Sequence, residues 1–180
     1  MRTGRNLSFI SDKVALAGDG ISCLIEKIVR TVNSGLSGLP LSRVVRQAMD
    51  KGLSEPDPRD DLSGMDVARK LLILARETGL KMELDEVQIK SFLPDACFEA
   101  TSVETFFVQL EKEDGRFEER RKKAERAGKV LRYTACLECG TARIGLEEVD
   151  AAHPFSTLQG SDNMIFFPRG SMNRRGERDV

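Results

Sequence analysis

The residues best suited to chemistry lie between positions 52 and 70. Carboxylates cluster there at Glu55, Asp57, Asp60 and Asp61. Negative charges packed this closely repel each other and favour a cationic occupant, either a basic side chain or the ammonium group of a small ligand. For Asp60 and Asp61 we prefer a simpler role, either capping the helix that follows or pairing with Arg59.

Asp66 and Lys70 follow the acidic segment at the spacing of one helical turn. On a helix they share a face, where an exposed pair contributes only about 0.3–0.5 kcal/mol. The simplest interpretation is therefore a surface salt bridge. The functional alternative is proton transfer by the lysine, which requires a cleft because burial lowers the pKa of an amine while nearby carboxylates raise it.

Two prolines control the geometry of the acidic segment. Pro56 and Pro58 fix their own φ angles and push Glu55 and Asp57 toward extended conformations, so we expect this segment to be stiff and not helical. The apolar residues of 65–78 share one face, which predicts a helix that carries the pair described above.

Other elements are predicted from periodicity and turn residues. Apolar spacing predicts further helices over 20–32, over 42–51 with Ser42 as N-cap, and over 101–111 and 116–128. The last interleaves both charge signs, which favours a solvated helix over a nucleic-acid surface. Strands are predicted over 81–84, 87–92 and 163–167, with a hairpin formed by 129–136 and 141–149. Helices precede strands, which indicates the α+β class.

Composition excludes several classes of protein. The chain has 180 residues with 28 Lys+Arg against 29 Asp+Glu, a net charge of −1. Without a basic excess we expect neither nucleic acid nor an anionic membrane as a partner, and no apolar run approaches the ~20 residues that cross a bilayer. The N-terminus lacks the apolar region of a secretory signal, so we expect a cytoplasmic setting.

The cysteines raise the question of a metal site. Cys136 and Cys139 have the spacing of half a zinc ribbon or of a redox pair. A closed zinc site needs two further ligands, and Cys23, Cys97 and His153 are scattered singly. We therefore expect no metal and interpret the pair as small buried residues beside a hairpin turn, with zinc or thiol chemistry as the alternative.

The segment from Gly52 to Lys70, GLSEPDPRDDLSGMDVARK, resembles the signature of homoserine dehydrogenases. Weaker similarity extends the resemblance over 20–167. The resemblance implies a mixed β-sheet with helices packed on one face, a homodimer, and NAD- or NADP-dependent interconversion of L-homoserine and L-aspartate 4-semialdehyde in threonine and methionine biosynthesis. This domain occurs in monofunctional enzymes and at the end of bifunctional aspartokinase–homoserine dehydrogenases. The resemblance also allows a parent protein located in plastids.

The resemblance also implies roles for individual residues. Lys70 would move the proton of the reacting alcohol during hydride transfer, Asp66 would orient the substrate and Lys70, and Glu55 would bind the ammonium of an amino-acid substrate. These roles agree with the chemistry of the side chains. Gly52 matches a position near the cofactor, although a helix end explains it equally well. His153 matches a position near the site, with a structural role beside its proline equally supported.

Both ends of the chain depart from the family pattern. Residues 1–19 match no part of the family and contain no complete Gly-x-Gly-x-x-Gly turn. Residues 168–180 are basic and almost devoid of apolar side chains, so we expect a disordered tail. We therefore expect 20–167 to be the catalytic domain without the family's Rossmann nucleotide-binding domain, inactive alone. The alternative is a catalytically silent fragment that serves as a dimerisation or interaction module.

Overall fold

The computed structural model describes residues 13–18, 39–138, 140–157 and 163–166. Their helices are α2 (Leu41–Asp50), α3 (Pro58–Leu62), α4 (Met65–Glu77), α5 (Asp95–Phe98) and α6 (Val103–Arg126), with 3₁₀ turns η1 (Leu84–Glu86) and η2 (Pro154–Thr157). The strands are β1 (Lys13–Gly18), β2 (Gln88–Lys90), β3 (Lys129–Glu138), β4 (Thr141–Asp150) and β5 (Asn163–Phe166). Among the residues of these ranges, no helix is long and apolar enough to cross a membrane.

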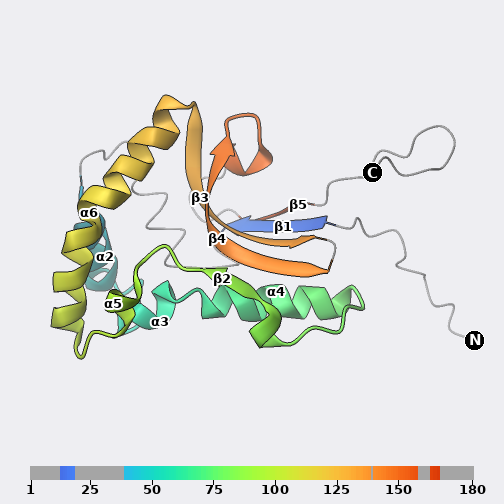
Figure 1. Cartoon of the computed structure of the whole chain (residues 1–180), viewed down its shortest axis with the longest axis horizontal. Helices are drawn as coiled ribbons and strands as arrows, with labels where there is room; N and C mark the ends of the chain where they lie inside the picture. The colour runs from blue at the N-terminus through green and yellow to red at the C-terminus, as the bar shows by residue number, and fades with distance from the viewer. Residues whose placement is uncertain (1–12, 19–38, 139, 158–162, 167–180) are drawn as a thin grey trace, which may run out of the picture.

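The strands form one mixed sheet in the order β2-β4-β3-β1-β5. β2 runs parallel to β4, and the other neighbours are antiparallel. The long hairpin of β3 and β4 forms the centre of this sheet, and β1, the first of the described strands, lies between β3 and β5 (Figure 1). The predicted mixed sheet is confirmed, and the described part of the chain holds no parallel, doubly wound Rossmann sheet.

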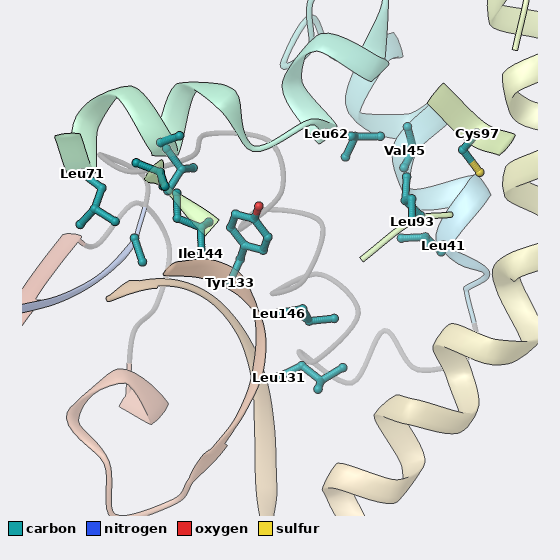
Figure 2. Close-up of a cluster of buried hydrophobic side chains, with 14 of the residues drawn as sticks. Leu41, Val45, Leu62, Leu71, Leu93, Cys97, Leu131, Tyr133, Ile144 and Leu146 are labelled. Carbon is teal, nitrogen blue, oxygen red and sulfur yellow. The ribbon is translucent and has the colours of Figure 1, made fainter. Parts of the chain in front are cut away.

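The helices cover one face of the sheet. α4 packs against β3 and β4, while α6 packs against β3, α2 and α5 (Figure 1). The buried stripe of α4 meets alternate residues of β3 in a single hydrophobic core (Figure 2). Because strand side chains alternate between faces, Leu131, Tyr133, Ala135 and Leu137 join this core while Arg132 points the other way. The predicted α+β arrangement with helices on one face is therefore confirmed.

Strong periodic patterns in the sequence predict elements that the structure contains. The helix over 65–78 is α4, the hairpin is β3 and β4, and 163–167 is β5. The strand predicted over 87–92 is present but is reduced to the three residues of β2. The predicted helix over 20–32 and the basic tail lie outside the described residues.

The structure differs from the predicted elements at three places, besides the acidic segment described below. Residues 81–84 are not a strand: 81–83 have no regular structure, and η1 begins at Leu84, where Glu83 and Glu86 cap each other's backbone N–H groups. The two helices predicted over 101–111 and 116–128 are one helix, α6, because nothing crowds Gly115 and the surrounding charges pair along the helix. No element was predicted at 13–18, where β1 lies.

Ser42 is not the N-cap of α2. Pro40 holds that position, and Ser42 lies in the first turn, where its N–H and its hydroxyl donate to the two carboxylate oxygens of Asp114 at 2.8 and 2.6 Å. A carboxylate from α6 therefore satisfies the N-terminus of α2, which ties the two helices together.

Candidate functional site

The acidic segment is partly helical, contrary to prediction. Pro58 begins α3, a position where the missing N–H of proline costs nothing and its fixed φ suits a helix. Asp57 is extended as expected, and its carboxylate accepts the N–H of Arg59 at 3.0 Å as the N-cap. The second proline therefore starts a short helix instead of preventing one.

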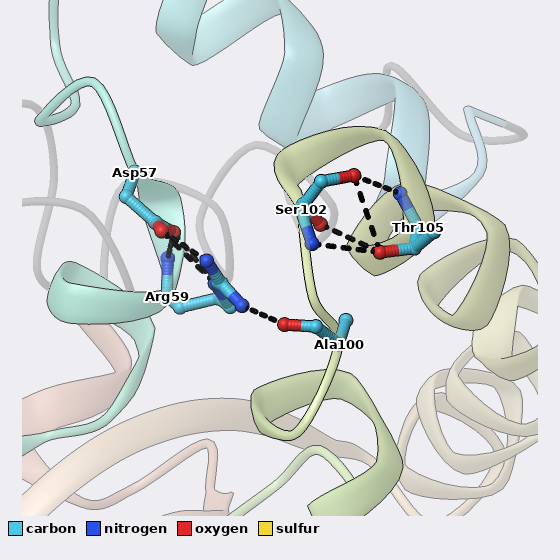
Figure 3. Close-up of polar contacts among 5 residues, drawn as sticks. All are labelled: Asp57, Arg59, Ala100, Ser102 and Thr105. Atoms are coloured by element: carbon cyan, nitrogen blue, oxygen red, sulfur yellow. Dashed lines mark hydrogen bonds and ion pairs between the residues drawn. The ribbon is translucent and has the colours of Figure 1, made fainter.

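Arg59 fastens this turn to a distant part of the chain (Figure 3). Its Nε donates to both carboxylate oxygens of Asp57 at 2.8 and 3.0 Å, and its guanidinium also donates to the carbonyl of Ala100. Ala100 precedes Ser102, whose reciprocal hydrogen bonds with Thr105 cap α6. Hydrogen bonds from the Arg59 side chain lower the pKa of the Asp57 carboxyl against the opposing effect of burial. The acidic turn is thus held against the start of α6.

Asp61 folds back onto the start of the turn. Its Oδ2 accepts the hydroxyl of Ser54 at 3.0 Å and the N–H of Glu55 at 2.9 Å. The preference for Asp60 and Asp61 as caps of the following helix was wrong, because Gly64 is the N-cap of α4 and both carboxylates lie in the first turn of α3. The predicted ion pair of Arg59 forms with Asp57 instead.

Glu55 is the carboxylate that this network leaves uncommitted. Its N–H donates to Asp61, and its carbonyl lies 3.0 Å from the Ser54 hydroxyl, whose one proton is shared with Asp61, so hydrogen bonds hold its main chain. Its side chain is exposed, and within the described ranges no donor contacts its carboxylate. The turn therefore fixes the main chain of Glu55 and leaves its exposed carboxylate available to a cation.

The structure brings Asp66 and Lys70 together on α4. Lys70 Nζ donates to Asp66 Oδ2 at 2.6 Å, and the two side chains are 39% and 58% exposed. Three cavities of about 350, 360 and 100 Å³ lie along α6 and the edge of β4, and none of these three is lined by Glu55, Asp66 or Lys70. Among the described residues the pair faces solvent, with no hydrogen bond to Glu55.

Gly52 is explained by the end of α2. Its φ is +66°, and its N–H donates to the carbonyl of Met49 at 2.8 Å. The N–H of Leu53 donates to the carbonyl of Ala48 at 2.9 Å. These bonds form a Schellman helix end, which favours glycine. Since both amides already donate within the helix end, they do not fit a nucleotide phosphate. The cofactor role of Gly52 stays a prediction.

His153 and Arg132 organise the turn after β4. His153 Nδ1 accepts the N–H of Phe155 at 3.1 Å, and the two rings meet edge to face, which supports its structural role. Arg132 is only 5% exposed and donates to the carbonyls of Phe155 and Ser156 at 2.8 and 2.9 Å. No role was predicted for Arg132, although a lone arginine in an apolar strand is a signal for buried hydrogen bonding.

The cysteine alternative gains no support from the described residues. Cys136 is buried in β3 with Arg143 near its sulfur, and Cys139 lies outside the described residues. No group of three potential metal ligands gathers within the ranges that the structure describes.

Comparisons with known sequences show the family. A family model described as homoserine dehydrogenase matches residues 22–174. The bifunctional aspartokinase/homoserine dehydrogenase 2, chloroplastic, of Arabidopsis thaliana is 44% identical over 137 residues, which cover 75% of this chain and 15% of that protein. The homoserine dehydrogenase of Schizosaccharomyces pombe is 43% identical over 129 residues, which cover 70% of this chain and 34% of that protein. The chain thus spans about a third or less of these relatives.

Solved structures share the fold. A Candida auris protein of unknown function matches with a TM-score of 0.78 and 33% identity, covering 87% of this chain and 44% of that one. A Staphylococcus aureus homoserine dehydrogenase matches with a TM-score of 0.65 over 91% of this chain and 35% of its own. Its 16% identity supports the fold alone. Together with the family model and the sequence relatives, these matches show that the chain belongs to the homoserine dehydrogenase family.

Proposed function

We propose that this chain supplies the substrate half of a homoserine dehydrogenase, the part that binds L-homoserine or L-aspartate 4-semialdehyde. The observation that carries the proposal is the exposed, uncommitted carboxylate of Glu55 on a turn whose main chain is held by hydrogen bonds. An amino-acid ammonium is the cation that this family's substrate would offer it. NAD or NADP would be bound by a nucleotide-binding unit outside the described residues.

Each polar side chain of the site has one task in this proposal. Glu55 binds the substrate ammonium, and Asp66 holds the Lys70 ammonium group at 2.6 Å. Reduction of the aldehyde would need hydride from a nicotinamide cofactor held by another unit. Lys70 gives its Nζ proton to the carbonyl oxygen, and in the reverse direction it takes the proton of the homoserine hydroxyl. Contact with a second unit would enclose the exposed pair and exclude water.

Homoserine binding by the whole chain tests this proposal. We expect Glu55→Gln to weaken binding at least about tenfold in calorimetry, because a charge-assisted hydrogen bond is lost. Asp60→Asn is the matched control, since Asp60 is an exposed carboxylate on the same turn that interacts with Arg59 and has no role in the proposed site. Equal affinities for the unchanged chain and Glu55→Gln would contradict the proposal.

A second measurement tests the division of labour. We expect no NADPH oxidation when the chain alone is given aspartate 4-semialdehyde, because the described residues supply only the substrate side of the site. Oxidation above the background rate would contradict the assignment of the nucleotide to another unit.

The alternative is a catalytically silent dimerisation or interaction module. The exposure of Asp66 and Lys70, and their position outside the three cavities, favour it. Sedimentation should then show a homodimer that does not bind homoserine, and a monomer would count against this alternative. A cytoplasmic location stays a prediction, and the names of several plant relatives place those proteins in the chloroplast.

A further inference from the structure

Gly64 forms the corner between α3 and α4 and lies directly above β3. It is buried, its φ is +79°, and it is the N-cap of α4. A Cβ at this position would overlap the hydroxyl oxygen of Tyr133 and would contact Cγ2 of Ile89 at 3.4 Å. Glycine is therefore required for two independent reasons, the left-handed backbone and the close approach of the tyrosine.

Tyr133 is a rigid support for this corner. Its side chain is 2% exposed, and its ring meets Phe92 edge to face with centroids 6.1 Å apart. It extends from the middle of β3, where it pairs with Leu146 of β4. Figure 2 shows the ring rising from the sheet with its hydroxyl toward the chain between α3 and α4. A buried ring on a paired strand has little freedom to move away from the corner.

Both halves of the candidate site are connected to this corner. Asp61, three residues before Gly64, holds the main chain of Glu55 through its carboxylate. Asp66, two residues after Gly64, holds Lys70 one turn along α4. A displacement of the corner would therefore move the acidic turn relative to the helix-borne pair, and 1 Å of misplacement is enough to impair a polar site.

We propose that Tyr133 is a positioning residue of the site. Its hydroxyl and ring hold the Gly64 corner at a fixed height above the sheet, which sets the placement of Glu55 relative to Asp66 and Lys70. The inference rests on the proposed function, because the placement matters only if these side chains share one substrate.

A double-mutant cycle on the whole chain tests the inference. The variants are Gly64→Ala, Tyr133→Phe and the combination, each measured for homoserine affinity by calorimetry and for free energy of unfolding in denaturant. Gly79→Ala is the matched control: Gly79 also has a positive φ, +87°, but a Cβ there would meet nothing within 4 Å. It therefore carries the backbone strain without the overlap.

We expect Gly64→Ala to weaken homoserine binding at least about tenfold and Gly79→Ala to change it less than about twofold, although both lower stability. Adding Tyr133→Phe should restore part of the affinity of Gly64→Ala, because removing the hydroxyl oxygen makes room for the methyl group. In the Gly79→Ala background, Tyr133→Phe should change homoserine affinity by the same factor as it does in the unchanged chain, because the two sites are independent.

Each outcome decides the inference. If Gly64→Ala does not fold, Tyr133→Phe alone remains decisive, because it keeps the ring and should still weaken binding about threefold or more. Equal affinities of the folded variants and the unchanged chain would overturn the role of Tyr133 while leaving the proposed function intact. If the unchanged chain does not bind homoserine, the proposed function fails and the inference fails with it.

Discussion

Asp66 and Lys70 make a contact that any exposed helix could provide. Their 2.6 Å pair spans one turn, and solvent reaches both side chains. Water screens such a pair, so it contributes little to the free energy of unfolding. An effect of either residue on ligand binding can therefore be separated from an effect on folding.

Asp66→Asn should change the free energy of unfolding by less than about 0.5 kcal/mol while weakening homoserine binding about tenfold. Denaturant unfolding and calorimetry measure the two effects. Glu111→Gln is the control, because Glu111 of α6 forms a similarly exposed ion pair with Arg46 of α2. Unchanged homoserine affinity in Asp66→Asn would contradict the role of Asp66 in the site.

Tyr133 predicts a loss of stability at alkaline pH. Burial raises the pKa of Tyr133 from its usual 10.0 to about 12. Below pH 10.0 the folded and the unfolded chain both keep the tyrosine proton. Above that pH the unfolded chain releases the proton first, so the free energy of unfolding falls by about 1.4 kcal/mol per pH unit until the folded chain releases it too. Denaturant unfolding across this range should show a shallower fall in Tyr133→Phe, and identical slopes would contradict the assignment.

At the scale of elements, the first turn of α2 depends on a hydrogen-bond acceptor from α6. Asp114→Ala would leave the N–H and hydroxyl of Ser42 without their acceptor, so we expect the free energy of unfolding to fall by about 1–2 kcal/mol. Glu111→Ala, one turn earlier on the same helix, should cost less than about 0.5 kcal/mol. Equal costs for the two variants would show that the cap contributes nothing specific.

Arg59 makes the acidic turn resistant to acid. Its hydrogen bonds lower the pKa of Asp57 below the usual 3.8, so this stabilisation is present above that pH and is lost as the pH falls through the lowered value. Arg59→Ala should therefore remove this contribution and release the turn from Ala100, and acid unfolding should begin at a higher pH. Circular dichroism during acid titration measures the midpoint, and an unshifted midpoint would exclude this role.

The elements that the sequence predicts correctly have long apolar periods, as in α4 and the β3–β4 hairpin. The errors fall where a few side chains decide the backbone. Asp57 caps α3 immediately after a proline, and Glu83 and Glu86 close η1 over residues with strand-like composition. The residue types of Glu55, Asp66 and Lys70 indicated the candidate site. The approach of Tyr133 to Gly64 could not be predicted, because sequence spacing does not give the height of a corner above a sheet.

At the scale of the whole molecule, β1 completes the sheet. It pairs with β3 on one side and with β5 on the other. Removing residues 1–18 should expose the edges of both strands, so we expect aggregation or loss of a cooperative unfolding transition. Removing only 1–12 keeps β1 and is the control. Size-exclusion chromatography and thermal unfolding distinguish the two, and a stable monomer without residues 1–18 would contradict this role.

The place of β1 also constrains how the protein folds. Leu16 pairs with Ala135, and Ala17 with Met164, so β1 pairs only with strands from a distant part of the sequence. Such sequence-distant pairing slows folding because a long loop must close before any contact compensates for it. We therefore expect β1 to join the sheet late in folding, after the local β3–β4 hairpin has formed.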